Sequence, residues 1–302
     1  MTAGPVSRHF VAALALGVLA LGVAASATQP AASRQLRVIV FGAHPDDAEL
    51  QAAGVATMWA AQGHKVKFVS ATNGDIGHFS QAGGPLAIRR KAEVLECARI
   101  LGITTDVLDI HDGELEPNLE TRRTFARKIR DWQADIVIGH RQYDYHPDHR
   151  YVGVLLNDTA VVVGAAFFVP DTPPTAGNPI YLNSADGFSD PRPFAPDVVV
   201  DIDAVAEKKF QCVAAMPSQF ADADSWQGRT LPNMPPDEAG RKAYIMETVQ
   251  RWLASSADQY RAQLIARYGQ ERGSRVKYAE AFQLNQYGRQ VKPAELDALF
   301  PR

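Results

Sequence analysis

Short β-branched runs alternate with longer helix-like segments through the first half of this 302-residue chain, and this alternation most constrains its fold. The strand-like runs cover residues 36–41, 66–71, 105–110 and 135–139. Helical composition covers residues 48–62, 85–101 and 119–132. Such alternation is typical of βαβ units. It therefore predicts an α/β fold, with a mostly parallel β-sheet covered by helices on both faces.

The second half of the chain is less regular. Loops rich in Pro, Gly and Asn are expected at residues 170–179 and 191–196, and a further strand at 198–202. Helices are expected at 203–215 and 243–268. Between these helices, residues 218–238 are rich in Asp, Pro, Met and Trp, which indicates a loop or lid near a substrate.

Charge and length exclude one class of partner and limit the number of domains. The formal net charge of -3 comes from mixed signs without a basic block, so a nucleic-acid partner is excluded. At 46% hydrophobic residues, the chain can bury a substantial core. We expect a single domain over residues 33–302, and the sequence leaves its oligomeric state open.

Residues 1–27 are predicted to be a signal peptide. Arg8 precedes an apolar run from residue 10 to residue 23, which is short for a bilayer span, and Ala25-Ser26-Ala27 is a suitable cleavage site. An uncleaved membrane anchor is the alternative, disfavoured because small residues end the run. We therefore expect a periplasmic or secreted protein with no stable membrane span after cleavage.

The chain contains two cysteines, Cys97 and Cys212. They could pair in an oxidising compartment, but two widely spaced cysteines do not define a disulfide framework or a metal motif. Apolar neighbours favour a core-facing helical position for Cys97. Whether the two cysteines pair is left open.

Six of the eight histidines fall just after predicted strands. They are His44 after the first strand, His78 after the second, His111 after the third, and His140, His146 and His149 after the fourth. In an open α/β sheet the loops at the carboxyl ends of the strands lie together and form the ligand crevice. The first half of the chain is therefore expected to build a histidine-based centre.

Two of these loops combine histidine with aspartate, as His44-Pro45-Asp46-Asp47 and His146-Pro147-Asp148-His149. A catalytic zinc site takes three nitrogen or oxygen ligands and keeps one position for water, a set that His44, Asp47 and His149 would supply. Adjacent aspartates point in different directions, so one can ligate while the other serves the water. Each His-Pro-Asp could instead be a turn with an aspartate cap. Two copies after two parallel strands favour the metal site.

These paired motifs resemble those of the PIG-L/LmbE-like zinc de-N-acetylases, a family that includes N-acetylglucosaminyl-phosphatidylinositol deacetylases. The resemblance extends from about residue 37 to residue 150. It implies a Rossmann-like α/β fold and hydrolysis of an acetamide on an amino sugar. The chain departs from many members at Ala48, where they have glutamate, and at Asp144, where some have a mobile tyrosine.

Carried over by position, the resemblance implies a role for each site residue. His44, Asp47 and His149 would be the zinc ligands, and Asp46 the general base. His146 would stabilise the oxyanion or protonate the leaving amine, with Asp148 orienting it. Arg90 and Asp112 would contact the substrate.

The sequence thus predicts a zinc-dependent hydrolase that removes an N-acetyl or other N-acyl group from an N-acetylglucosamine-like sugar or glycoconjugate. Bound zinc lowers the pKa of water and polarises the amide carbonyl, while Asp46 accepts the proton as attack begins. Another divalent ion could replace zinc. The alternatives are an amidase for a non-sugar N-acyl compound and a noncatalytic carbohydrate-binding relative.

Overall fold

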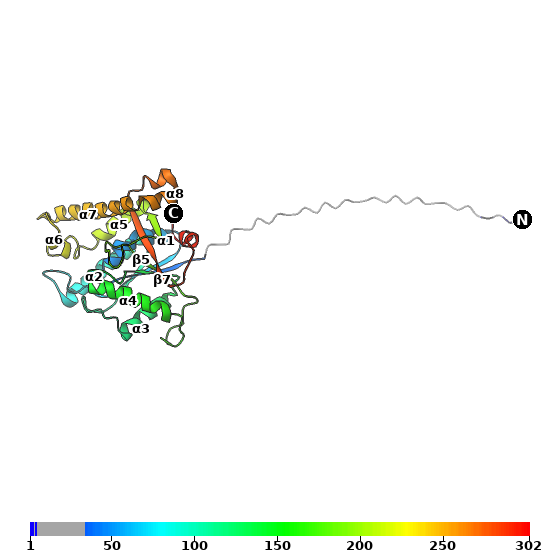
Figure 1. Ribbon diagram of the computed structural model, residues 1–302, viewed down its shortest axis with the longest axis horizontal. Coiled ribbons are helices and arrows are strands. Elements are labelled where there is room, and N and C mark those ends of the chain that lie inside the picture. The colour runs from blue at the N-terminus through cyan, green and yellow to red at the C-terminus, as the bar shows by residue number, and fades with distance from the viewer. Residues whose placement is uncertain (3, 5–33) are drawn as a thin grey trace. The chain divides into compact units, whose positions relative to one another are not determined.

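The computed structural model describes residues 1, 2, 4 and 34–302, and the statements below concern these residues (Figure 1). Most of the predicted signal peptide, residues 1–27, lies outside the described residues. Residues 35–302 form one compact unit. Within the described residues, no helix has the length and apolar character needed to cross a bilayer.

One mixed sheet organises this unit. Its strands are β1 (Arg37–Gly42), β2 (Lys65–Ser70), β3 (Thr104–Val107), β4 (Ile136–Gly139), β5 (Ile180–Ser184), β6 (Val198–Asp201) and β7 (Ala279–Gly288). They lie in the order β3-β2-β1-β4-β5-β7-β6. The first five are parallel to one another, and β7 runs antiparallel between β5 and β6. The predicted α/β class with a mostly parallel sheet is confirmed.

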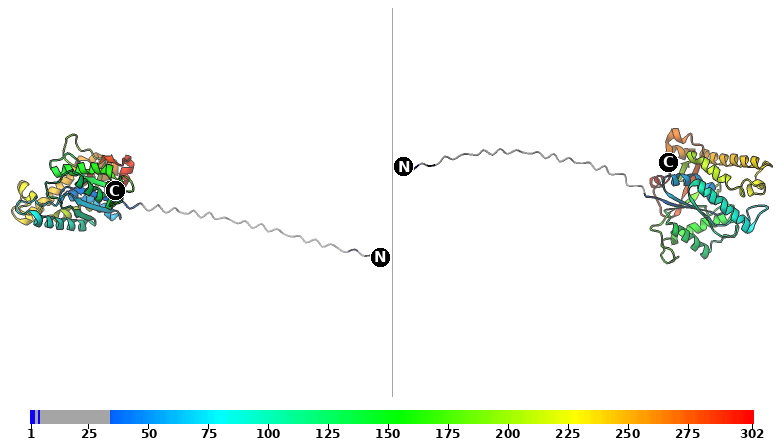
Figure 2. Two further views of the ribbon diagram at one scale, coloured as in Figure 1. Left: turned by 90° about the horizontal axis from the view of Figure 1, so that it is seen from below. Right: turned by 180° about the vertical axis from the view of Figure 1, so that it is seen from behind.

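Helices cover both faces of the sheet. They are α1 (Asp47–Ala61), α2 (Gly83–Leu101), α3 (Leu119–Trp132), α4 (Pro147–Val162), α5 (Ala206–Ala214), α6 (Trp226–Thr230), α7 (Glu238–Gln259), α8 (Arg261–Gly273) and α9 (Pro293–Leu299), with a 3-10 turn η1 (Asp203–Val205). Helices α3 and α4 lie on one side of the sheet and α5 and α7 on the other (Figures 1 and 2). Each side has its own apolar core, with Trp59 and Phe210 in one and Phe41 and Phe125 in the other.

The structure differs from the predicted elements mainly in the second half. Strands β5 and β7 were not predicted, and the helix expected over residues 243–268 is divided at Tyr260. The backbone of Tyr260 leaves the helical conformation there, and its buried ring packs against Phe194. Tyr260 belongs to a separate apolar cluster with Phe194, Val199 and Leu264, and burial of its ring there accounts for the break between α7 and α8.

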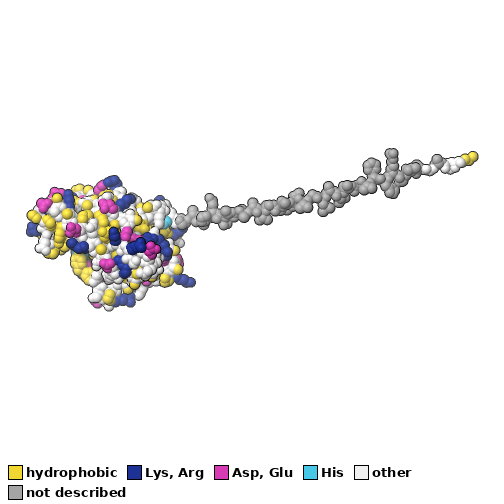
Figure 3. Space-filling model, turned by 90° about the horizontal axis from the view of Figure 1, so that it is seen from above, with side chains coloured by type: hydrophobic (Ala, Val, Ile, Leu, Met, Phe, Trp, Pro, Cys, Tyr) yellow, Lys and Arg dark blue, Asp and Glu magenta, His cyan; other side chains and the backbone are white. Residues whose placement is uncertain are grey.

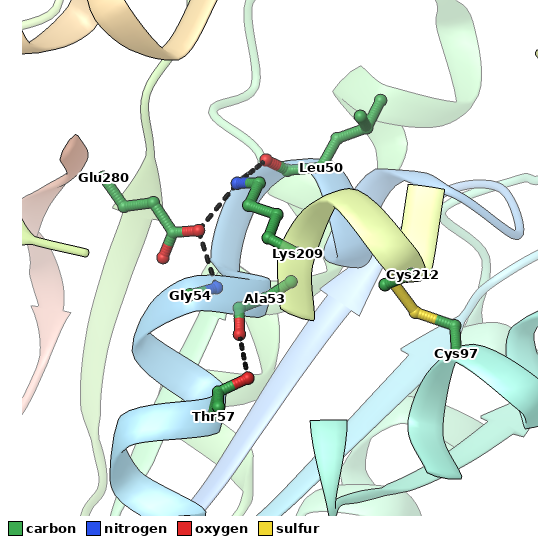
Figure 4. Close-up of a disulfide and its surroundings, with 8 residues drawn as sticks. All are labelled: Leu50, Ala53, Gly54, Thr57, Cys97, Lys209, Cys212 and Glu280. Carbon is green, nitrogen blue, oxygen red and sulfur yellow. Dashed lines mark hydrogen bonds and ion pairs between the residues drawn. A yellow bond between two sulfur atoms is a disulfide. The ribbon is translucent and has the colours of Figure 1, made fainter. Parts of the chain in front are cut away.

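A buried ion pair joins α1 to α5 and β7 (Figure 4). Lys209 donates to the backbone carbonyl of Leu50 (2.5 Å) and to the carboxylate of Glu280 (2.6 Å). Glu280 also accepts from the backbone amides of Gly54 and Val55, each at 2.8 Å. A Cβ on Gly54 would lie 2.9 Å from that carboxylate, so glycine allows the close approach.

Cys97 on α2 and Cys212 on α5 form a disulfide, drawn beside the ion pair in Figure 4. Both cysteines are fully buried, so Cys97 occupies the core-facing helical position that its neighbours indicate. The pairing answers a question that the sequence left open. Together with Lys209, it ties α5 to both α1 and α2.

The surface carries mixed charge. On the face shown in Figure 3, Lys and Arg side chains lie among Asp and Glu side chains. This view agrees with the near-balanced totals of 31 basic and 34 acidic residues in the whole chain.

Candidate active site

The candidate site lies where the strand order reverses, between the carboxyl ends of β1 and β4. The two strands are parallel neighbours, and β2 and β5 continue the sheet in opposite directions. This is the point at which open α/β sheets form their ligand crevice. A cavity of about 350 Å³ opens here. Its lining consists of His44, Asp46, Asp47, Ile76, Gly77, Arg90, Asp112, Tyr145, His146, His149, Gln219 and Trp226.

The three residues expected to hold a metal present their ligand atoms to one another. Nδ1 of His44 lies 3.4 Å from Oδ2 of Asp47 and 3.3 Å from Nε2 of His149. Nε2 of His149 lies 3.4 Å from Oδ1 of Asp47. Tetrahedral zinc with bonds of 2.0–2.1 Å has ligand atoms about 3.3–3.4 Å apart. The donor set therefore suits zinc, with Asp47 offering a different oxygen to each histidine.

Backbone amides fix the carboxylate of Asp47. Its Oδ2 accepts from the amides of Ala43 (2.9 Å) and His44 (2.8 Å). Oδ1 faces His149. Burial opposes ionisation of Asp47, but the imidazoles of His149 and His140 hold its pKa well below the usual value. The carboxylate is therefore ionised and oriented, as a metal ligand must be.

Carboxylates orient both candidate histidine ligands from behind. Nε2 of His44 lies 3.1 Å from Asp112 and 3.3 Å from Asp148, which leaves Nδ1 for a metal. Nδ1 of His149 lies 3.1 Å from Asp144, which leaves Nε2 for a metal. Carboxylates behind metal-binding imidazoles fix their tautomer and raise their basicity.

The site holds a positive charge readily. Burial disfavours the charged form of His44, yet hydrogen bonds to Asp112, Asp148 and Asp47 raise its pKa well above the ordinary value. A cation between His44, Asp47 and His149 would receive the same stabilisation from these carboxylates. The electrostatics of the site therefore also fit a bound divalent metal.

Asp46 differs from its neighbour. It occupies the N-cap position of α1, but its side chain caps none of the helix amides and instead lines the cavity. Burial and the adjacent charge of Asp47 raise the pKa of Asp46 to about 6. A buried carboxyl with a raised pKa beside a metal site is suited to proton transfer near neutral pH.

His146 forms the cap of α4 through its ring. Its Nδ1 accepts from the backbone amide of Asp148 (3.2 Å), so the neutral ring carries its proton on Nε2. Burial and the neighbouring His44 and His149 lower the pKa of His146. The ring lies 4.5 Å from that of His44, measured between centroids, and lines the cavity.

The carboxylate of Asp148 contacts partners other than the ring of His146, the residue it was expected to orient. It accepts from the backbone amides of Gly113 (2.7 Å) and Leu115 (3.2 Å) and lies beside His44. The reason is the start of α4, which turns the Asp148 amide, rather than its carboxylate, towards His146. Asp148 thus fixes His44 with its side chain and His146 with its backbone.

The two residues expected to contact substrate both lie in the cavity wall. Arg90 is buried and donates to the carbonyl of Gly77 (2.7 Å) and to the side chain of Gln219. Asp112 is also buried and contacts His44. Both can reach a ligand in the cavity.

The sequence did not identify several residues of the site. Asp144, which was assigned no role, supports His149. His140, one of the six histidines expected at this edge but also without an assigned role, lies 3.5 Å from Asp47. Ile76, Tyr145, Gln219 and Trp226 complete the cavity wall. The last two belong to the segment 218–238 predicted to be a loop or lid, which contains the short helix α6. The tryptophan in this segment was the one sequence feature that indicated its place near the site.

Comparisons with known proteins place this chain among similar sequences. Residues 39–160 match the family model described as PIG-L: GlcNAc-PI de-N-acetylase. A diacetylchitobiose deacetylase of Thermococcus kodakarensis is 30% identical over 197 residues, which cover 63% of this chain and 72% of that protein. A 4-oxalmesaconate hydratase of Pseudomonas putida is 24% identical over 197 residues, covering 61% and 74%.

A solved structure shares the fold. The N,N'-diacetylchitobiose deacetylase from Pyrococcus horikoshii, crystallised with an inhibitor, superposes with a TM-score of 0.62 at 23% identity. The match covers 82% of this chain and 83% of that one.

Proposed function

Because this chain belongs to the PIG-L (LmbE-like) family, as its paired motifs indicate, we propose that it is a zinc-dependent hydrolase that removes the N-acetyl group from an N-acetylglucosamine-like sugar or glycoconjugate. The observation that carries this proposal is the convergence of His44, Asp47 and His149, whose nitrogen and oxygen atoms approach one another to 3.3–3.4 Å, with Asp47 facing each histidine through a different oxygen. The carboxyl of Asp46, which caps no helix amide, lies in the same cavity. The relative named as a diacetylchitobiose deacetylase supports the reaction type.

The residues divide the chemistry between them. Zinc bound by His44, Asp47 and His149 would polarise the amide carbonyl and lower the pKa of water, and another divalent ion could take its place. Asp46 accepts the proton from the attacking water. His146 donates a hydrogen bond from Nε2 to the oxyanion. The leaving amine takes its proton from Asp46 or from His146.

Asp148, Arg90 and Asp112 support these steps. Asp148 holds His44 and His146 in place, while Arg90 and Asp112 orient the substrate from the cavity wall. Among the residues that the structure describes, the cavity lining contains one arginine, no lysine and three aspartates. With a divalent ion bound, the charges of the ion, the arginine and the three aspartates would cancel, which suits an uncharged acetamido sugar.

The decisive experiment measures amine release from N,N'-diacetylchitobiose together with zinc content. The purified protein should contain about one zinc per chain and release amine. Removal of the metal with a chelator should abolish release, and zinc should restore it. Full activity in the metal-free protein, or hydration of an unsaturated acid without any amine release, would contradict the proposal. Release from non-sugar N-acyl compounds alone would establish the amidase alternative.

A further inference from the structure

Two aromatic rings are exposed at the mouth of the cavity. Trp226 lines the cavity and is 47% exposed, and Phe79 beside it is 52% exposed. Their rings are stacked, with centroids 5.7 Å apart and planes inclined by 17°. Large aromatic side chains usually bury most of their surface, so an exposed stacked pair next to a reaction centre indicates a ligand-binding surface.

Main-chain contacts hold this pair in place. His78 and Ser225, the residues preceding each ring, form an antiparallel β-bridge. The amide of Phe79 donates to the carbonyl of Asp224 (2.9 Å). The guanidinium of Arg229 lies 5.5 Å from the Phe79 ring centroid and pairs with Asp224 at 3.0 Å. The rings are therefore oriented before any ligand arrives, which reduces the entropy cost of binding.

The position of the aromatic pair and the charged residues around it limit what the pair can bind. The same cavity reaches from His44, Asp46 and Asp47 at its floor to Trp226 at its mouth. Arg90 is the one Lys or Arg among the described residues that line it, and Arg90 already donates to Gly77 and Gln219. The mouth thus offers flat apolar faces, and the guanidinium beside them, that of Arg229, is already paired with Asp224.

We propose that Trp226 and Phe79 form a stacking platform for a second, uncharged sugar ring, so that the substrate is a disaccharide or longer saccharide. The sugar ring whose acetamide is hydrolysed lies at the cavity floor, and the C–H face of the next pyranose packs against the indole of Trp226. Aromatic rings provide such contacts at small conformational cost. This inference rests on the proposed function and deepens it by assigning the substrate class.

The kinetic test compares N-acetylglucosamine, N-acetylglucosamine 1-phosphate and N,N'-diacetylchitobiose. The zinc-loaded protein should prefer the disaccharide in kcat/KM. Trp226→Ala should lower that preference by about tenfold, mainly through KM, as expected for the loss of one stacking contact. Phe79→Ala should lower it less, and Trp226→Phe should restore part of it.

Matched controls are available elsewhere on the surface. Trp252 is 44% exposed and Phe167 is 92% exposed, and neither lines this cavity. Trp252→Ala and Phe167→Ala should leave the preference unchanged. Equal losses for monosaccharide and disaccharide in Trp226→Ala, or a preference for the phosphate, would overturn the inference.

Binding separates this inference from the proposed function. Calorimetry with metal-loaded protein and chitobiose, the fully deacetylated disaccharide, measures the platform without turnover. If no acetyl sugar is hydrolysed but chitobiose binding falls about tenfold in Trp226→Ala, the platform stands and the proposed reaction fails. If chitobiose does not bind, or binds Trp226→Ala equally well, the platform is refuted.

Discussion

Asp46 and Asp47 are neighbours in the chain with opposite environments. Two backbone amides hold Asp47, and nearby imidazoles depress its pKa, whereas the side chain of Asp46 caps no amide and its pKa is raised to about 6. The difference follows from the start of α1, because Asp46 is the non-helical N-cap and Asp47 is the first helical residue, so their side chains leave the backbone in different directions. One carboxylate therefore faces the metal ligands and the other faces the cavity.

We expect this division to appear as a two-by-two pattern in variants. Asp47→Ala and His149→Ala should lose zinc, since each removes a proposed ligand. Asp46→Ala and His146→Ala should retain zinc but lose turnover by about a hundredfold to ten-thousandfold, as is typical when a general acid or base is removed. Zinc content and deacetylation rate are measured on all four proteins after circular dichroism has established that each is folded. Loss of zinc from Asp46→Ala with retention in Asp47→Ala would reverse the assignment.

At the residue scale, the sequence identified side chains that sit in short motifs next to strand ends. His44, Asp47 and His149 converge because parallel strands deliver their following loops to one edge. Asp144 and Trp226 were not assigned, because their contacts with His149 and the cavity arise from tertiary packing that no local spacing encodes.

At the scale of elements, helix α1 contributes both to the candidate site and to the buried ion pair. Its first turn supplies Asp46 and Asp47, and its middle receives the Lys209–Glu280 pair through backbone groups of Leu50 and Gly54. Both charged side chains are essentially inaccessible to solvent, at 0% and 2% exposure. Removal of one partner leaves the other charge buried without compensation.

Lys209→Met should therefore lower the free energy of unfolding by about 3–5 kcal/mol. Adding Glu280→Gln to this variant should cost less than the two single losses combined, because the pair is coupled. Urea denaturation measures both. The control is Lys242→Met, which breaks an exposed pair with Glu238 on α7 and should cost less than about 1 kcal/mol. Equal effects at Lys209 and Lys242 would show that the buried pair is not structural.

This pair also explains why β7 was missed. The strand includes the polar residues Glu280, Gln283 and Asn285, which interrupt the apolar pattern expected of a largely buried strand. Glu280 is accommodated there because Lys209, 71 residues away in sequence, neutralises it. The first four strands and α3 were predictable because their apolar residues pack within the sheet and its helices and need no distant polar partner.

In the molecule as a whole, the Cys97–Cys212 disulfide closes a long loop, with 115 residues of sequence separation. Cross-links across long loops stabilise mainly by restricting the unfolded chain. The Cys97→Ala/Cys212→Ala protein should lose about 2–4 kcal/mol of unfolding free energy. Its deacetylation rate should persist under native conditions, since neither cysteine lines the cavity. Unchanged urea midpoints for the oxidised and the cysteine-free proteins would contradict this expectation.

We also propose that the protein is exported, with residues 1–27 removed. The mature chain should begin at Thr28 in the periplasm or medium, because Ala25-Ser26-Ala27 precedes this position. Mass spectrometry of the protein from cell fractions measures the N-terminus directly. Soluble cytoplasmic protein with an intact Met1 would refute export. A disulfide between the chain's two cysteines is the state favoured outside the cytoplasm.

The cavity draws its floor and its mouth from separate stretches of chain. Its proposed reaction centre comes from residues between His44 and His149, while Gln219 and Trp226 come from the segment around α6. Exchange of that later segment can therefore alter which molecules enter while leaving His44, Asp47 and His149 in place. Arg90, which donates to Gln219, and Phe79, which stacks on Trp226, are the points at which such an exchange would reach the first stretch.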